Sequence, residues 1–116
     1  MLHVVEPIHM TAAFGGEPIV LPERPAAFFR ELKASLDKIA RRECRGVARV
    51  SAHLREGVAY DEIVVAARKL KVDLIVIATH GRSGLMRALM GSTAERVARH
   101  APCPVLVVPP GGGRGR

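Results

Sequence analysis

The stretch DLIVIATHGRSG, residues 73–84, decides the fold class, because an apolar strand runs directly into a glycine-bearing loop. Leu74–Ala78 is a continuous apolar run with β-branching, which predicts a strand that is buried on both faces. Val105–Val108 predicts a second strand of the same kind. Between the two, Ser92-Thr93-Ala94-Glu95 matches a capping box and predicts a helix that ends at His100. The order strand, loop, helix, strand is typical of a parallel βαβ unit.

The remainder of the chain continues this alternation of strands and helices. The expected elements are a strand at Leu2–Val5, an amphipathic helix that begins with Pro25 in its first turn and ends near Gly46, a strand within Val47–Leu54, and a helix from Gly57 to about Lys71. Residues 6–24 are rich in proline and glycine and show no clean period, which predicts a long loop. We therefore predict an α/β fold, an open parallel sheet with helices on both faces, in one domain over residues 1–108. Residues 109–116 are expected to form a disordered Pro/Gly/Arg tail.

Length and composition exclude several classes of protein. The chain has 116 residues, of which 48% are hydrophobic and 25% charged, as in one ordinary globular domain. No apolar run approaches the roughly 20 residues that span a bilayer, and no secretory signal pattern follows Met1. Cys44 and Cys103 are too few for a disulfide framework. We expect a cytoplasmic protein that does not engage membranes.

The net charge of +7 favours an anionic partner, and the basic excess lies mainly in the C-terminal half of the chain. A merely solvated basic surface is the alternative explanation of the same charge. The aromatic residues amount to 3% of the chain, and there is no tryptophan. Because single-stranded nucleic acid is held largely by aromatic stacking, nucleic acid is not the expected partner.

The loop after the strand at residues 74–78 is a candidate anion site. Gly81 and Gly84 lack a Cβ, so their backbone N–H groups can approach a phosphate closely, and Arg82 adds a cation. A helix that begins at Ser92 adds unpaired N–H donors at the positive end of its dipole. The glycine spacing matches neither a Walker A motif nor a dinucleotide fingerprint. Two alternatives stay open: Ser92 acts only as a helix cap, and the glycines serve only turn geometry.

Three segments, residues 73–85, 91–97 and 100–108, closely resemble the universal stress protein family, and Leu2–Pro7 resembles that family's second strand and its exit. The resemblance implies an adenine-nucleotide alpha-hydrolase-like, Rossmann-like fold. The ATP-binding members of the family carry Gly-x2-Gly-x9-Gly-Ser/Thr. Gly81 and Gly91-Ser92 match this pattern, and Ala78 stands where its first glycine is expected.

The resemblance also assigns roles to individual residues. Gly81, Gly91, Ser92 and Thr93 would surround the phosphates and ribose, Val4 would line the adenine pocket, and Ala78 would lie beneath the nucleotide. The implied ligand is ATP with magnesium, and the implied partner is a second copy of the chain, paired through the strand at Val105–Val108. Relative to the family, the first strand and first helix have no counterpart in this sequence. We therefore expect an N-terminally truncated domain without the central strand of the sheet and with a weakened nucleotide site.

No catalytic residues are expected. No serine or cysteine has an evident general base, so the resemblance to ATP-binding proteins implies at most very slow ATP hydrolysis. The histidines at positions 3, 9, 53, 80 and 100 are scattered and do not make a metal set. The alternative function is a dimeric interaction or regulatory module of the same fold that binds no ligand.

Overall fold

The computed structural model describes the backbone of residues 1–7, 9–10, 19–20, 23–79 and 90–109. The chain divides into two compact units, residues 1–58 (unit 1) and 59–116 (unit 2), and each is described by itself. The site predictions at Gly81, Arg82 and Gly84 lie outside the described residues, as does the tail from residue 110 onward.

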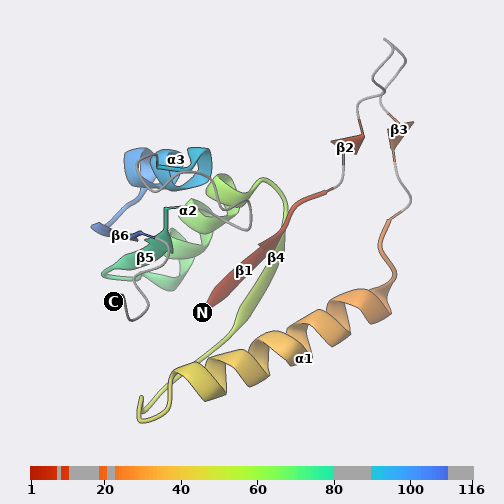
Figure 1. The fold of residues 1–116 in the computed structure, drawn as a ribbon, viewed down its shortest axis with the longest axis horizontal. Coiled ribbons are helices and arrows are strands. Elements are labelled where there is room, and N and C mark those ends of the chain that lie inside the picture. Colours follow the sequence, from red (N-terminus) through yellow and green to blue (C-terminus); the bar gives the residue numbers. More distant parts are fainter. Residues whose placement is uncertain (8, 11–18, 21–22, 80–89, 110–116) are drawn as a thin grey trace, which may run out of the picture. The chain divides into compact units, whose positions relative to one another are not determined.

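Unit 1 is built on two parallel strands that one long helix connects (Figure 1). Strand β1 (Leu2–Val5) pairs with β4 (His53–Glu56) in parallel, and helix α1 (Ala26–Glu43) lies between them in the chain. Two short strands, β2 (His9–Met10) and β3 (Ile19–Val20), pair antiparallel. The prediction of a continuous loop over residues 6–24 is wrong at these two strands, because segments of two residues are too short to show a period-2 pattern.

Helix α1 confirms the predicted amphipathic helix. Its N-cap is Pro25, whose missing N–H costs nothing where the helix begins. Leu36 and Ala40 are buried and cluster with Ala52, whereas Phe28 remains 38% exposed. The buried face of α1 is therefore narrow, because a sheet of two strands about 4.8 Å apart gives a helix little surface to cover.

The register of β1 against β4 determines where β4 lies in the sequence. The predicted strand at residues 47–54 is displaced: β4 begins at His53 and extends past the predicted end to Arg55 and Glu56. The N–H of His53 donates to the carbonyl of Met1 at 2.8 Å, and the N–H of Gly57 donates to the carbonyl of Val5 at 3.0 Å. Pairing with β1 thus outweighs the weak strand propensity of the charged residues.

Unit 2 contains the predicted βαβ unit and one preceding helix (Figure 1). Its elements are α2 (Ala59–Leu70), β5 (Ile75–Ala78), α3 (Ser92–His100) and β6 (Val105–Val108). Strands β5 and β6 are parallel, so the predicted α/β fold with parallel strands is confirmed. Helices α2 and α3 pack against each other through small apolar side chains, and the buried set is Val64, Ala66, Ala67, Ala94 and Val97.

The strands β5 and β6 are not buried on both faces, which corrects the sequence prediction. Ile75 and Ile77 are half-buried, whereas the alternate residues Val76 and Leu106 are 61% and 52% exposed. Within the described residues, β5 and β6 have only each other as backbone partners. No described helix is both long and apolar enough to cross a bilayer.

The fully buried Val97 makes unit 2 sensitive to a small cavity. Val97→Ala should lower the free energy of unfolding by about 2 kcal/mol, because it removes buried methyl groups and leaves a void. Urea denaturation followed by circular dichroism measures the loss. The matched control is Val76→Ala, which removes the same atoms from an exposed position and should change stability by less than about 0.5 kcal/mol. Equal losses in the two variants would contradict the described packing.

Candidate functional site

The candidate site lies at the carboxyl ends of β5 and β6, where α3 begins. The N–H of Thr79 donates to the carbonyl of Val108 at 2.9 Å, which continues the β5–β6 ladder by one residue. The carbonyl of Thr79 accepts a hydrogen bond of 2.6 Å from the N–H of Gly91. Both ends of the segment between Thr79 and Gly91 are therefore fixed at one edge of the sheet, where ligands bind in open α/β sheets.

Helix α3 begins without a side-chain cap. Its N-cap is Gly91, with φ −62° and ψ 153°, and no side-chain hydrogen bond caps the helix. Ser92 is the first helical residue and its side chain is exposed, so the predicted capping box with Ser92 as the cap is wrong. The reason is positional: the bond between Gly91 and Thr79 fixes the helix start one residue before the serine.

The start of α3 has the electrostatics of an anion site. The dipole of a helix places partial positive charge at its N-terminus, and the first N–H groups have no partner within the helix. Glu95 is the acidic residue of the first turn, and its Oε1 accepts a hydrogen bond of 2.7 Å from Arg99. This pairing offsets the one negative charge of the turn, although both side chains are largely exposed and water screens their interaction.

The structure brings together four of the eight predicted site residues. Ala78, Gly91, Ser92 and Thr93 lie at this edge of unit 2. Val4 is half-buried in β1 and belongs to unit 1. Sequence reasoning missed Thr79, which joins β6 and Gly91 through its backbone; its place directly after the last strand residue was the available signal.

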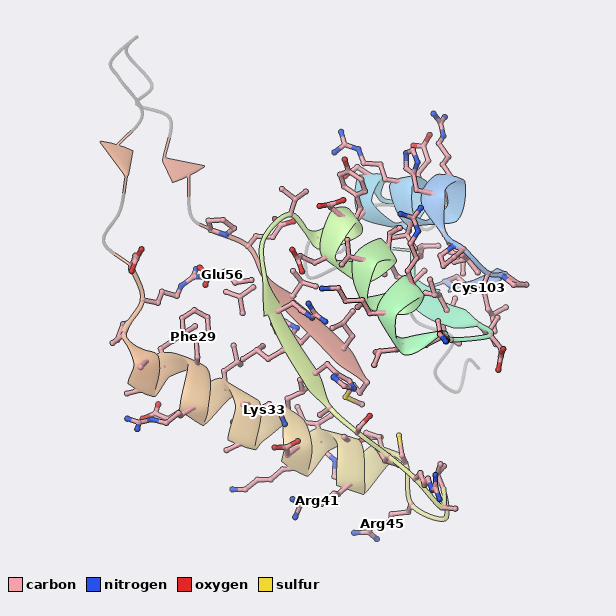
Figure 2. All side chains as sticks on the ribbon, turned by 180° about the vertical axis from the view of Figure 1, so that it is seen from behind. Phe29, Lys33, Arg41, Arg45, Glu56 and Cys103 are labelled. Carbon is pink, nitrogen blue, oxygen red and sulfur yellow. The ribbon has the colours of Figure 1, made fainter. Side chains whose placement is uncertain are left out.

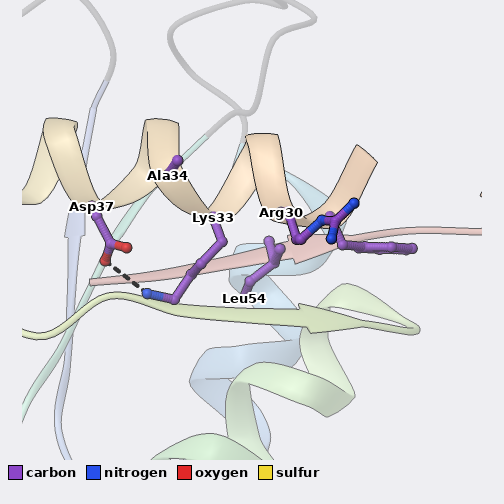
Figure 3. Close-up of a pocket in the computed structure, with 6 residues that line it drawn as sticks. Arg30, Lys33, Ala34, Asp37 and Leu54 are labelled. Carbon is purple, nitrogen blue, oxygen red and sulfur yellow. Dashed lines mark hydrogen bonds and ion pairs between the residues drawn. The ribbon is translucent and has the colours of Figure 1, made fainter. Parts of the chain in front are cut away.

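The described residues of unit 1 form a hollow of about 510 Å³ between α1 and β4 (Figure 3). Its lining consists of Phe29, Arg30, Lys33, Ala34, Asp37 and Leu54. Phe29 and Lys33 project from α1, as Figure 2 shows. Lys33 Nζ lies 2.7 Å from Asp37 Oδ1, so the carboxylate offsets the lysine charge, and Arg30 is the other cation of the lining.

No group of three or more His, Cys, Asp or Glu side chains among the described residues is placed to hold a metal ion.

Comparison with known proteins identifies a family and several relatives. The family model described as "Universal stress protein family" matches residues 1–109. Universal stress protein MJ0531 of Methanocaldococcus jannaschii is 45% identical over 78 residues, which cover 67% of this chain and 46% of that protein. The universal stress protein E homolog of Haemophilus influenzae is 30% identical over 110 residues, which cover 89% of this chain and 36% of that protein. The chain thus spans less than half the length of these two relatives.

Solved structures agree on the fold. The structure of hypothetical protein MJ0577 superposes with a TM-score of 0.61 at 32% sequence identity, over 71% of this chain and 57% of that one. Universal stress protein UspA from Lactobacillus plantarum superposes with a TM-score of 0.60 at 24% identity, over 92% of this chain and 74% of that one. The second likeness supports the fold alone, since its sequence identity is low.

The uncapped start of α3 predicts that Ser92 contributes little to stability. Ser92→Ala should change the free energy of unfolding by less than about 0.5 kcal/mol, whereas loss of a true N-cap costs about 1 kcal/mol. Thermal and urea unfolding measure the change. Ser35→Ala, at an exposed serine in the interior of α1, is the reference for losing a helical hydroxyl. A loss above 1 kcal/mol that is confined to Ser92 would restore the capping role.

Proposed function

The chain belongs to the universal stress protein family, and on that premise we propose that it is a cytoplasmic stress-response module that binds ATP or a related adenine nucleotide. The proposed site is the loop between β5 and α3. The observation that carries the proposal is the hydrogen bond of 2.6 Å between Gly91 and Thr79, which holds Gly91-Ser92 at the carboxyl end of β5. This is the edge at which ligands bind in parallel α/β sheets.

Each residue of the matching pattern has a distinct part in this proposal. The N–H of Gly91 already donates to Thr79, so Gly91 contributes by the absence of a Cβ rather than as a donor. The N–H groups and hydroxyls of Ser92 and Thr93 are the proposed phosphate and ribose contacts at the helix N-terminus. The Ser92 hydroxyl is suited to this part because it is exposed and does not cap the helix.

Further parts of the proposed site rest on the resemblance alone. Ala78 is exposed at the end of β5, and its single methyl group is the smallest departure from the glycine of the family pattern. Gly81, Arg82 and Gly84 would add N–H groups and a cation. Magnesium would enter with ATP and offset phosphate charge. We expect no catalysis beyond very slow hydrolysis, since the sequence shows no serine or cysteine with an evident general base.

Calorimetric titration of the full chain with ATP and magnesium tests the nucleotide site. We expect saturable binding that weakens about tenfold in Ser92→Ala, because one hydrogen bond to a charged phosphate is lost. Gly91→Ala should fold, since φ −62° and ψ 153° suit any L residue, and should bind more weakly still, because its Cβ enters the phosphate approach. Ser35→Ala is the matched control and should bind like the parent.

The outcome that contradicts the proposal is the absence of saturable heat up to millimolar ATP in a folded protein. The ligand-free interaction module would then be the better description. If Ser35→Ala and Ser92→Ala weakened ATP binding equally, the loop between β5 and α3 would not be the binding site.

We also propose that two copies of the chain pair through β6. Within the described residues, β6 pairs only with β5, and its aliphatic residues leave one edge unpaired. An exposed aliphatic edge is an aggregation hazard that pairing with a second copy removes. The carbonyls of Pro104 and Val108 accept hydrogen bonds from β5. By the alternation of a parallel ladder, the backbone groups of Val105 and Val107 point to the outer edge.

A proline at the outer edge tests this pairing. Val107→Pro should preserve β5–β6, because the N–H that it removes points away from β5, and should convert a dimer into a monomer. Light scattering at tens of micromolar measures the mass, with circular dichroism to verify folding. Val58→Thr, at a 54% exposed valine of unit 1, is the control and should remain dimeric. A monomeric parent chain contradicts the proposed dimer.

A further inference from the structure

The C-terminal end of α1 and the turn after it carry a concentration of positive charge that the proposed nucleotide site does not use. Residues 38–50, which we call the basic tip, contain five basic side chains and one acidic side chain, Glu43. The basic members are Lys38, Arg41, Arg42, Arg45 and Arg49. All five are exposed, and Figure 2 shows Arg41 and Arg45 at this end of α1.

The backbone of the basic tip is ordered by its own hydrogen bonds. The N–H of Cys44 donates to the carbonyl of Ala40 at 3.0 Å and ends the helix, and the N–H of Val47 donates to the carbonyl of Cys44 at 3.2 Å. Gly46 has φ +85°, a conformation that favours glycine, and its missing Cβ would meet nothing within 4 Å. The turn is therefore shaped by the backbone and stands open to solvent around Gly46.

Most of the positive charge of the basic tip has no acidic partner in the part of the chain that the structure describes. Arg42 Nε lies 2.6 Å from Glu43 Oε1, and this is the ion pair within the tip. The described ion pairs do not include Arg41, Arg45 or Arg49. The helix dipole favours cations in the last turn of α1, but it falls off within that turn and does not account for Arg49 in the loop.

Apolar side chains accompany these charges. Val47 is 59% exposed, Val50 is 38% exposed and Ile39 is 41% exposed. Aliphatic exposure beside arginines is not needed for solubility, nor for binding a free phosphate. Exposed arginines beside exposed aliphatic side chains suit a lipid surface. Headgroup phosphates bind the cations, and the boundary with the acyl chains buries the apolar groups.

We propose that the basic tip docks on membranes that contain anionic phospholipids. The planar guanidinium groups of Arg41, Arg45 and Arg49 bind headgroup phosphates, for which arginine offers a two-pronged fork of N–H donors. Val47 enters the boundary between headgroups and acyl chains. The tip contains no aromatic side chain on which a nucleobase would stack, so lipid is favoured over single-stranded nucleic acid. The basic tip shares no residue with the proposed nucleotide site, so this proposal does not depend on that site. It revises the expectation that the chain does not engage membranes, which rested on the lack of an apolar run long enough to span a bilayer and did not address docking at the surface.

Cosedimentation of the full chain with vesicles tests the proposal, without added nucleotide. The probes are vesicles of phosphatidylserine with phosphatidylcholine and vesicles of phosphatidylcholine alone. We expect binding to the anionic vesicles only, and weaker binding as salt rises. The double variant Arg45→Gln/Arg49→Gln should partition about 25-fold more weakly, since each basic residue near an anionic surface contributes about fivefold.

Two further variants distinguish a defined surface from general charge. Val47→Ser should weaken binding severalfold with no change in charge, which a purely electrostatic attraction would not do. Arg68→Gln/Lys69→Gln removes the same charge from two exposed residues of α2 and should bind vesicles within about twofold of the parent. Circular dichroism establishes that each variant is folded.

Three results would overturn the proposal. They are equal binding to neutral and anionic vesicles, equal loss in the α2 double variant, and tighter binding to a single-stranded RNA oligonucleotide that Val47→Ser leaves unchanged. The last result would assign the basic tip to nucleic acid. Loss of ATP binding with vesicle binding intact would count against the nucleotide site alone.

Discussion

Parallel strand pairing is the constraint on which the rest of this structure depends. A parallel partner cannot be reached by a tight turn, so each pair requires a long crossover that returns the chain to the same end of the sheet. Helix α1 makes the crossover from β1 to β4, and α3 makes the crossover from β5 to β6. The helices exist where they do because the strands need them, and their small buried residues, such as Ala40 and Ala94, allow close packing.

The same constraint creates the candidate site. A crossover must leave one strand and enter a helix at the carboxyl edge of the sheet, and there its backbone groups need partners. Thr79 supplies one partner to Gly91 and another to Val108, so a single residue ties the strand, the helix start and the neighbouring strand together. An uncapped helix N-terminus beside that tie offers N–H groups to an anion. The basic tip lies at the C-terminal end of α1, which makes the crossover of unit 1. There the turn from the helix back to β4 leaves arginines and valines exposed to solvent.

Sequence patterns predicted the elements better than their boundaries or their burial. The helical spacing of apolar residues over 26–43 predicted α1 closely, because a helix of 18 residues contains several turns of that repeat. Strand β4 was misplaced by several residues, since its four residues are charged or polar except Leu54, and only its register with β1 fixes them. For the site, the capping-box motif at residues 92–95 located the start of α3, but the N-cap is Gly91 rather than Ser92, because the Gly91 N–H donates to Thr79.

The sequence by itself determined the alternation of strands and helices, the parallel α/β class, the family and the loop in which a nucleotide site was sought. These features follow from local periodicity and short motifs, which depend only on residues close together in the sequence. The tertiary structure alone decided that Val76 and Leu106 face solvent while Val97 is fully buried, and that Val47 and Val50 after α1 remain exposed. The physical reason is that burial and register depend on which distant segments of the chain meet, and no local pattern records those contacts.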